Sequence, residues 1–220
     1  MAWDLLAENF NDLTDWTDQD SGAAVSEISP AGILKQSNSA SGSRALISQT
    51  LETGPGTADF TIEVKIKFGS VPAAAHNYSF YFGATTNDQI LYFISAGMQV
   101  LGGGLQTAIT KTWVADTWYT IRVIFHTSQT KADTYLDGVL QNSDVAAYVG
   151  YANPGYLWVN TNDQVIVANC EMSTDYLYIG AGQQVPSTTS IKKVSGVAHA
   201  SIKKIGGVAI GSVKKIAGVE

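Results

Sequence analysis

Carboxylate pairs are the first feature of this chain that could do chemistry. Two carboxyl groups placed two or four residues apart on one strand can act as nucleophile and general acid in the hydrolysis of a glycosidic bond. Glu63 is alone on its predicted strand, and Glu171 and Asp175 are separated by Met172–Thr174, which we interpret as a loop. We therefore expect these acids to be solvated surface groups, and we predict no catalytic residues.

The three histidines and the single cysteine form no recognisable catalytic or metal-binding motif. His76 lies in a predicted loop, His126 ends a predicted strand, and His199 lies near the carboxyl end. The chain has no glycine loop for phosphate, no Cys/His zinc set and no Ser-His-Asp order. Cys170 alone cannot form an internal disulfide, so nothing in the composition requires an oxidising compartment.

Aromatic side chains are the second feature that could do chemistry, because they stack on sugar faces while Asn and Asp fix the hydroxyl groups. Three tyrosines fall within nine residues of one predicted loop. We expect such residues to contact a glycan, and the alternative is that they anchor loops or line a subunit interface. The candidate glycan-binding residues are Trp113, Tyr148, Tyr151, Tyr156 and Trp158.

Alternating strands must position these residues. In Phe60–Phe68 every second residue is apolar, which predicts a half-buried antiparallel strand, and Trp118–Phe125 is a second such strand. An Asp-Gly turn at 137–138 predicts a type I′ hairpin, in which we expect Tyr135 to face the core and its two strand neighbours to face away. Further strands are predicted at 22–28, 32–37, 44–50, 77–84, 89–95, 97–101, 104–110, 132–136, 156–161 and 175–180.

Length and composition agree with one all-β domain and an appendage. The chain has 220 residues, of which 45% are hydrophobic and 15% charged, and 21 are glycine. A dozen short strands with regular turns and no long helix predict a two-sheet antiparallel sandwich of the jelly-roll type. We assign residues 1–183 to this sandwich, 184–189 to a linker and 190–220 to an extended β-repeat tail.

Charge is distributed unevenly along the chain. The net charge is −6, yet residues 187–220 hold six lysines and one acid, whereas the first 186 residues hold seven basic and eighteen acidic side chains. An acidic body repels nucleic acid and anionic membranes. We therefore expect neither as a partner, and we expect the tail to bind an acidic protein surface, including that of another copy.

The first ten residues contain two acids and no basic residue, and no run approaches eighteen apolar residues. These features are unlike a secretory signal or a transmembrane helix. The expectation is a protein made in the cytosol, and a surface adhesin would lack the export signal that it needs.

The tail repeats every eleven residues, with serine at Ser190, Ser201 and Ser212 and a Lys-Lys pair two residues after each. Eleven residues match three helical turns, but glycine in every repeat and the Val/Ile content favour short strands. Such strands can add to the edge of a neighbouring sheet, whereas the alternative is a disordered tail. The candidate assembly residues are Ile191, Lys192, Lys193, Val194, Val197, Ile202, Lys203, Lys204, Ile205, Val208, Ile210, Val213, Lys214, Lys215 and Ile216.

Five segments together resemble the concanavalin A-like lectin/glucanase superfamily in its laminin-G-like form. They are Glu8–Trp16, Phe60–Phe68, Thr117–Phe125, Ala132–Gly138 and Thr174–Gly180, and the resemblance covers roughly residues 4–183. It implies the sandwich fold. It does not imply one function, because lectins, hydrolases, lyases and structural modules share this fold.

The resemblance also implies particular sites. Many members bind Ca²⁺ at the sandwich edge, and the matching positions are Glu8, Asn9, Gly42 and Asp175, whose oxygens suit this ion. Lyases of the superfamily place Arg, His and Tyr around a uronate, and a lyase stays open as an alternative.

The tail is similar to short tandem SIKKIxGVA repeats at the C-termini of phage structural proteins. The two resemblances together imply a non-enzymatic virion subunit, in a capsid decoration, tail or fibre, that contacts other virion subunits, copies of itself and host-surface glycans. The alternative is a free carbohydrate-binding or polysaccharide-degrading protein.

Overall fold

The computed structural model describes residues 5–40, 42–50, 58–72, 78–82, 90–101, 104–147, 157–162 and 169–182, and four two-residue strands between residues 193 and 209. The chain divides into two compact units, residues 1–184 and 185–220. No helix in these described ranges has the length and hydrophobicity needed to cross a bilayer.

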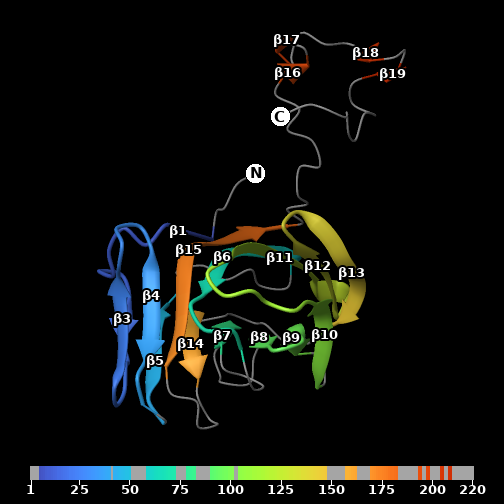
Figure 1. The fold of residues 1–220 in the computed structure, drawn as a ribbon. Coiled ribbons are helices and arrows are strands. Elements are labelled where there is room, and N and C mark those ends of the chain that lie inside the picture. The colour runs from blue at the N-terminus through green and yellow to red at the C-terminus, as the bar shows by residue number, and fades with distance from the viewer. Residues whose placement is uncertain are drawn as a thin grey trace. The chain divides into compact units, whose positions relative to one another are not determined.

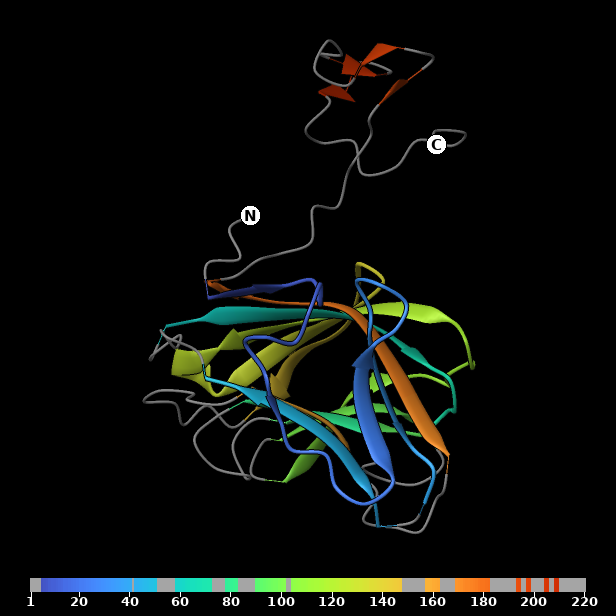
Figure 2. The ribbon, with the colours of Figure 1, turned by 90° about the vertical axis from the view of Figure 1, so that its left-hand side faces the viewer.

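The first unit is a sandwich of two antiparallel sheets (Figures 1 and 2). Sheet A has eight strands in the order β13-β12-β11-β6-β15-β4-β3, with β1 paired to β15. Sheet B has seven strands in the order β10-β9-β8-β7-β14-β5-β2. The all-β sandwich predicted from the sequence is therefore confirmed.

The strand bounds are as follows. Sheet A contains β1 (Leu6–Glu8), β3 (Ala24–Ile28), β4 (Leu34–Asn38), β6 (Phe60–Phe68), β11 (Trp118–His126), β12 (Lys131–Leu136), β13 (Val139–Ala146) and β15 (Cys170–Ala181). Sheet B contains β2 (Thr17–Asp18), β5 (Arg44–Gln49), β7 (Tyr78–Phe82), β8 (Ile90–Ile94), β9 (Gly97–Leu101), β10 (Leu105–Thr110) and β14 (Leu157–Asn162). A single 3₁₀ turn, η1 (Thr127–Gln129), follows β11.

Alternation along β6 and β11 builds the core between the sheets. The apolar positions of β6 are fully or almost fully buried, and so are those of β11 that the sequence assigned to one face. Phe68 of β6 lies against Tyr78 of β7 and Phe93 of β8, with ring centroids 5.0 and 5.5 Å apart. Aromatic contacts of this kind join the two sheets.

The hairpin between β12 and β13 has the predicted turn, but the side chains of β12 face the opposite way from the prediction. Asp137 and Gly138 have φ of +50° and +78°, as a type I′ turn requires. Tyr135 faces outward, because the register places it opposite Arg122 on the outer side of β11. Thr134 faces inward and is fully buried, since its hydroxyl donates to the Ala108 carbonyl at 2.7 Å.

One other expectation was wrong, and one strand was missed. Met172–Thr174 is not a loop but part of β15, which runs without interruption from Cys170 to Ala181. Strand β13 was not predicted, because seven of its eight side chains are exposed and its register with β12 is irregular. Trp118 lies on the outer face of β11 with the Lys65 ammonium 5.3 Å from its ring centroid.

The second unit contains two hairpins of two-residue strands. Strand β16 (Lys193–Val194) pairs with β17 (Val197–Ala198), and β18 (Lys204–Ile205) pairs with β19 (Val208–Ala209). The second hairpin repeats the first eleven residues later, which confirms strands instead of a helix at these positions. Of the candidate assembly residues, Ile191, Lys192, Ile202, Lys203, Ile210, Val213, Lys214, Lys215 and Ile216 lie outside the described residues.

Candidate functional site

The outer face of sheet B follows from the alternation of two aromatic strands. Tyr78 and Phe80 of β7 are fully buried in the core, so Ser79 and Tyr81 point to the other side of the sheet. In β8, Leu91 and Phe93 are in the core and Tyr92 faces outward. Each strand thus has aromatic residues on both faces.

The register assembles these outward residues into two rows across sheet B. Residues that are directly opposite on neighbouring strands share a face. One row includes Ser48 of β5 and Tyr81 of β7. The other includes Leu46, Ser79, Tyr92, Gln99 and Thr107.

Tyr81 and Tyr92 form an aromatic pair at the centre of this face. Their ring centroids are 6.1 Å apart and their planes meet at 82°, the edge-to-face geometry that aromatic rings favour. Burial, reinforced by the neighbouring Tyr81, raises the pKa of Tyr92 above its ordinary value. Its hydroxyl therefore remains a hydrogen-bond donor at neutral pH.

Hydroxyl and amide groups surround the tyrosine pair. Ser79 is fully buried, and its Oγ has no hydrogen-bond partner among the described residues. A buried hydroxyl without a partner costs free energy, so it is a group that a polar ligand can satisfy. Nearby, Gln19 Nε2 donates to Ser48 Oγ at 2.7 Å.

Carboxylates are absent from six of the seven strands of sheet B, and the seventh, β2, has Asp18 at its end, opposite the core residue Ile47. Strands β5, β7, β8, β9, β10 and β14 contain no Asp or Glu and a single cation, Arg44. Glycoside hydrolysis by the usual mechanism needs two carboxyl groups. These six strands offer aromatic rings, hydroxyls and amides instead, which is the chemistry of binding an uncharged polar ligand.

The outer face of sheet A is different, because its charges are paired with one another. Arg122 Nε donates to Glu63 Oε2 at 2.6 Å, Arg122 Nη2 contacts the same oxygen, and the Tyr176 hydroxyl donates to Glu63 Oε1 at 3.1 Å. Glu63 and Arg122 are each only 8% exposed, so the expectation of a solvated Glu63 was wrong. Burial and the Glu63 charge raise the pKa of Tyr176, which stays a proton donor in this network.

Glu171 and Asp175 require a correction. They lie four residues apart on one strand, β15, which is the spacing that a catalytic pair needs. Asp175 sits at a bulge in the pairing with β6 and forms an ion pair with Lys65 at 2.6 Å. Glu171 pairs with Lys35 at 3.0 Å.

The expected glycan-binding residues have different fates. The prediction for Trp113 was wrong, because this residue is 4% exposed and its Nε1 donates to the carbonyls of Ile94 and Gly97 at 2.9 and 3.2 Å. Trp158 is in β14, where its backbone pairs opposite Ser48 of β5 and Tyr81 of β7. Tyr148, Tyr151 and Tyr156 lie outside the described residues.

The four expected calcium ligands do not meet at one point. Gly42 is in the β4–β5 turn next to the pair Asn38–Cys170, whereas Glu8 is opposite Leu177. The offset along β15 between Cys170 and Leu177 corresponds to roughly 23 Å, so the Gly42 carbonyl cannot share an ion with Glu8. No cluster of three Asp, Glu, His or Cys suited to a metal occurs in the described part of the chain.

The remaining calcium candidates already have protein partners. Glu8 accepts hydrogen bonds from the Phe10 N–H at 2.5 Å and from Trp16 Nε1 at 3.0 Å. Asn9 Oδ1 accepts one from the Tyr178 hydroxyl at 2.6 Å, and Asp175 is paired with Lys65. In this structure the oxygens of Glu8, Asn9 and Asp175 therefore bind protein donors, and calcium binding stays a prediction.

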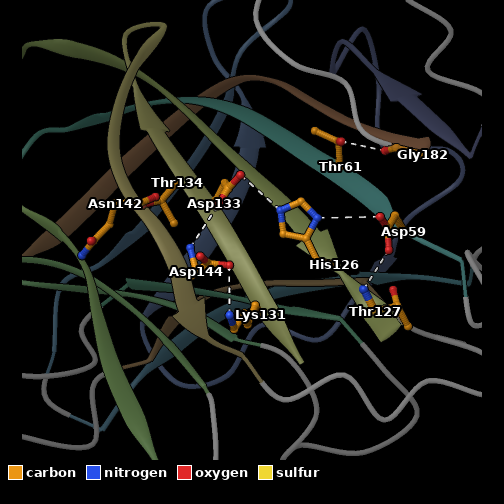
Figure 3. A network of polar contacts seen from close by, with 10 residues as sticks. All are labelled: Asp59, Thr61, His126, Thr127, Lys131, Asp133, Thr134, Asn142, Asp144 and Gly182. Atoms are coloured by element: carbon orange, nitrogen blue, oxygen red, sulfur yellow. Dashed lines mark hydrogen bonds and ion pairs between the residues drawn. The ribbon is translucent and has the colours of Figure 1, made fainter. Parts of the chain in front are cut away.

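His126 belongs to a network at the end of β11 (Figure 3). Its Nε2 is 3.1 Å from Asp133 Oδ2 and its Nδ1 is 3.7 Å from Asp59 Oδ2. Asp59 also accepts the Thr127 N–H at 2.9 Å, and its carbonyl accepts the Gly182 N–H at 2.6 Å. The network ties the starts and ends of several sheet A strands together, and it confirms His126 as a polar residue at a strand end.

Sequence reasoning missed Ser79, Tyr81, Tyr92 and Gln99. Both strands of the tyrosine pair were predicted, but alternation alone does not show which aromatic set faces the core when both sets are aromatic. A second signal was present: the same strands contain no charged residue on either face.

Comparisons with known proteins identify the fold. No protein-family model matches the chain, and no curated protein is similar to it. Among solved structures, a sialidase gives a TM-score of 0.64 at 12% identity, over 83% of this chain and 19% of that chain. A carbohydrate esterase from the Shiga toxin-encoding bacteriophage phi24B gives 0.55 at 13%, over 81% of this chain and 98% of that chain.

A third similar structure is the binding domain of botulinum neurotoxin DC in complex with SialylT, with a TM-score of 0.56 at 13% identity. The match covers 81% of this chain and 48% of that chain. The chain thus spans about a fifth of the sialidase, half of the neurotoxin domain and nearly all of the phage esterase. At such identities the likeness establishes a sandwich fold that occurs in carbohydrate-binding and glycan-active proteins.

Proposed function

We propose that the sandwich is a non-catalytic glycan-binding module and that the outer face of sheet B is its binding face. The observation that carries the proposal is the Tyr81–Tyr92 pair next to the buried, unpartnered hydroxyl of Ser79, on strands without a carboxylate. The tyrosine rings supply apolar surface for a sugar ring, while Ser79 and Gln99 supply hydrogen bonds to its hydroxyls. A neutral saccharide fits this chemistry best.

The paired charges of sheet A argue against catalysis there. A lyase needs a cation to neutralise a uronate carboxylate, but the charge of Arg122 is already compensated by Glu63. His126 is four residues further along β11, roughly 13 Å away, and lies between two aspartates. The raised pKa keeps the Tyr176 phenol protonated at neutral pH, so it is not available to accept a proton. These features favour a structural role for the sheet A network.

The similar structures add support of a general kind. A sialidase and a phage carbohydrate esterase are named for their action on carbohydrates, and the neurotoxin domain is a binding domain in complex with SialylT. We further propose, from the sequence resemblances, that this chain is a virion subunit of the concanavalin A-like superfamily, and the phage origin of the esterase is compatible with the first part of that proposal.

Removing either tyrosine of the pair is expected to weaken glycan binding strongly. Tyr81→Ala and Tyr92→Ala each lose a stacking surface, and we expect affinity to fall at least about ten-fold. The full chain is first screened on an array of neutral and sialylated oligosaccharides, and the best ligand is then titrated by calorimetry. Tyr135→Ala is the matched control, because this partly exposed tyrosine lies on the outer face of sheet A.

Three outcomes contradict the proposal. The array detects no ligand, or the control weakens binding as much as the two test variants do, or the chain releases reducing ends from the bound glycan. The last result would favour the polysaccharide-degrading alternative and would direct attention to Glu171 and Asp175.

The role that we propose for residues 185–220 is to attach the module to other subunits of a virion and to other copies. The hydrophobic core lies within residues 5–182, so truncation after residue 186 is expected to leave the sandwich folded. The truncated chain should keep its thermal midpoint within a few degrees, bind glycan normally and be missing from purified particles. Incorporation of the truncated chain at the wild-type level refutes the attachment role.

A further inference from the structure

Strand β3 ends sheet A and has a strand neighbour on one side only among the described residues (Figure 1). The Ser29 N–H donates to the Ile33 carbonyl, and the Ser39 N–H donates to the Ala23 carbonyl. These two bonds at the ends of β3 show which of its residues are hydrogen-bonded to β4. Because antiparallel pairs alternate between bonded and non-bonded, every second residue of β3 directs its N–H and C=O away from β4. These residues are Ala24, Ser26 and Ile28.

The outer side chains of β3 combine an apolar group with an acid. Val25 is 49% exposed, and Glu27, two residues on, is exposed on the same side. Val25 also lines a hollow of about 350 Å³ that reaches across Ser37 of β4 to Glu171 of β15. A strand added next to β3 would place one of its side chains against Val25 and the side chain two residues away against Glu27.

Charge around this edge is mainly negative. Residues 5–34 include six acidic and no basic side chains, and Lys35 of β4, which lies opposite Glu27, is paired with Glu171 at 3.0 Å. Asp12, Asp15, Asp18 and Glu27 among them are exposed. A basic strand is therefore attracted to β3, and an acidic strand is repelled.

The tail repeats have a complementary pattern. Each repeat has an apolar residue and a lysine two positions apart, as in Ile191 and Lys193, Ile202 and Lys204, or Val213 and Lys215. Two positions is the spacing of Val25 and Glu27. Lys193–Val194 and Lys204–Ile205 are strands in the structure, and each pairs with a single partner strand among the described residues.

We infer that β3 is the docking edge for a tail repeat of a second copy of this chain, which adds to sheet A as an extra strand. Backbone bonds to Ala24, Ser26 and Ile28 would supply affinity, and the Val25–Glu27 pair would select the apolar-x-Lys pattern. The inference rests on the proposed attachment role of the tail and names its site.

A second copy is the occupant that the proposed attachment role requires. Each chain has one β3 and three repeats, so one repeat of every tail can occupy a β3 edge in an assembly of copies. Because all copies have the same edge, tails that dock on neighbouring copies join the chains into one assembly.

The backbone part of the inference is tested with Ala24→Pro in the full chain. This proline removes an N–H that points away from β4, so the hydrogen bonds between β3 and β4 are kept. A strand added on the other side of β3 loses one hydrogen bond and clashes with the proline ring. Self-association measured by sedimentation velocity should weaken at least about ten-fold, with the thermal midpoint nearly unchanged. Ala24→Ser, which keeps the N–H, is the matched control.

The side-chain part is tested by exchanging charges. Glu27→Lys alone, and Lys193→Glu with Lys204→Glu and Lys215→Glu alone, should each weaken self-association, whereas combining the two sets in one chain should restore it. Asp15→Lys makes the same charge change in the same acidic segment but off β3, and should have little effect.

The following results would overturn the inference. A wild-type chain that stays monomeric at every concentration excludes docking between copies. Equal losses in Asp15→Lys and Glu27→Lys show non-specific attraction, and full association of Ala24→Pro excludes strand addition. Glycan titration of Ala24→Pro is expected to be normal, so failure of this inference is distinguishable from failure of the glycan-binding proposal.

Discussion

Arg122→Ala is expected to lower the free energy of unfolding by about 3–5 kcal/mol, because it leaves a buried carboxylate without its cation. Glu63 is 8% exposed, and Arg122 supplies both of its charged donors, Nε and Nη2. The Tyr176 hydroxyl is a neutral donor to the other oxygen and cannot replace that charge. Urea denaturation of the wild type and the variant at neutral pH measures the difference.

A surface pair gives the matched control. Lys67 is 3.8 Å from Asp116, whose side chain is 77% exposed, and Lys67→Ala should change stability by less than about 1 kcal/mol. The double variant Arg122→Met with Glu63→Leu should recover most of the loss, because no unpaired charge remains. A loss below about 1 kcal/mol in Arg122→Ala would show that water reaches Glu63 and that the network is not buried in solution.

Strand positions were predictable from the sequence because one face of each strand is buried. In β6 and β11 the apolar and polar positions alternate, and the structure places each set as predicted. The same reasoning failed at Tyr135, since a threonine took the inward position. Thr134 is tolerated there because its hydroxyl donates to Ala108, a partner on another sheet that no local pattern can reveal.

The site was harder to predict than the fold, because type and spacing do not determine exposure. Trp113 has the right chemistry for stacking on a sugar, but its indole N–H is bonded inside the core. Tyr81 and Tyr92 have the same chemistry and face outward, and only the register shows that they meet. The carboxylates were misjudged for the same reason, since Glu63 is covered by residues distant in the chain.

The two outer faces of the sandwich divide its polar chemistry. On sheet A, acids and bases compensate each other through Glu63–Arg122, Asp175–Lys65 and Glu171–Lys35. On sheet B, the strands have almost no charge, and Ser79 lacks a partner among the described residues. If sheet B binds a glycan as we propose, stability and recognition use different polar groups, because the groups offered to the ligand are not those that hold sheet A together.

Phe68 connects this frame to the proposed binding face. Its ring lies in β6 of sheet A and contacts Tyr78 of β7, Phe93 of β8 and Trp113, with centroids 5.0 to 5.5 Å apart. Phe68→Ala removes all three contacts and leaves a cavity, so we expect a loss of about 3–5 kcal/mol in the free energy of unfolding. Urea denaturation measures it, and the exposed Val139→Ala should change stability by less than about 0.5 kcal/mol.

The same variant should also weaken glycan binding, although Phe68 does not reach the outer face of sheet B. Tyr78 precedes Ser79, and Phe93 follows Tyr92, so a cavity beneath them lets both outward residues shift. Phe60→Ala is the matched comparison, because Phe60 is equally buried and stacks on Phe125 of the adjacent sheet A strand at 4.7 Å. Both variants should unfold more easily, but only Phe68→Ala should lower affinity in calorimetry under conditions where both remain folded. Equal affinities in the two variants would mean that the proposed binding face does not depend on the packing of Phe68 against the core side of β7 and β8.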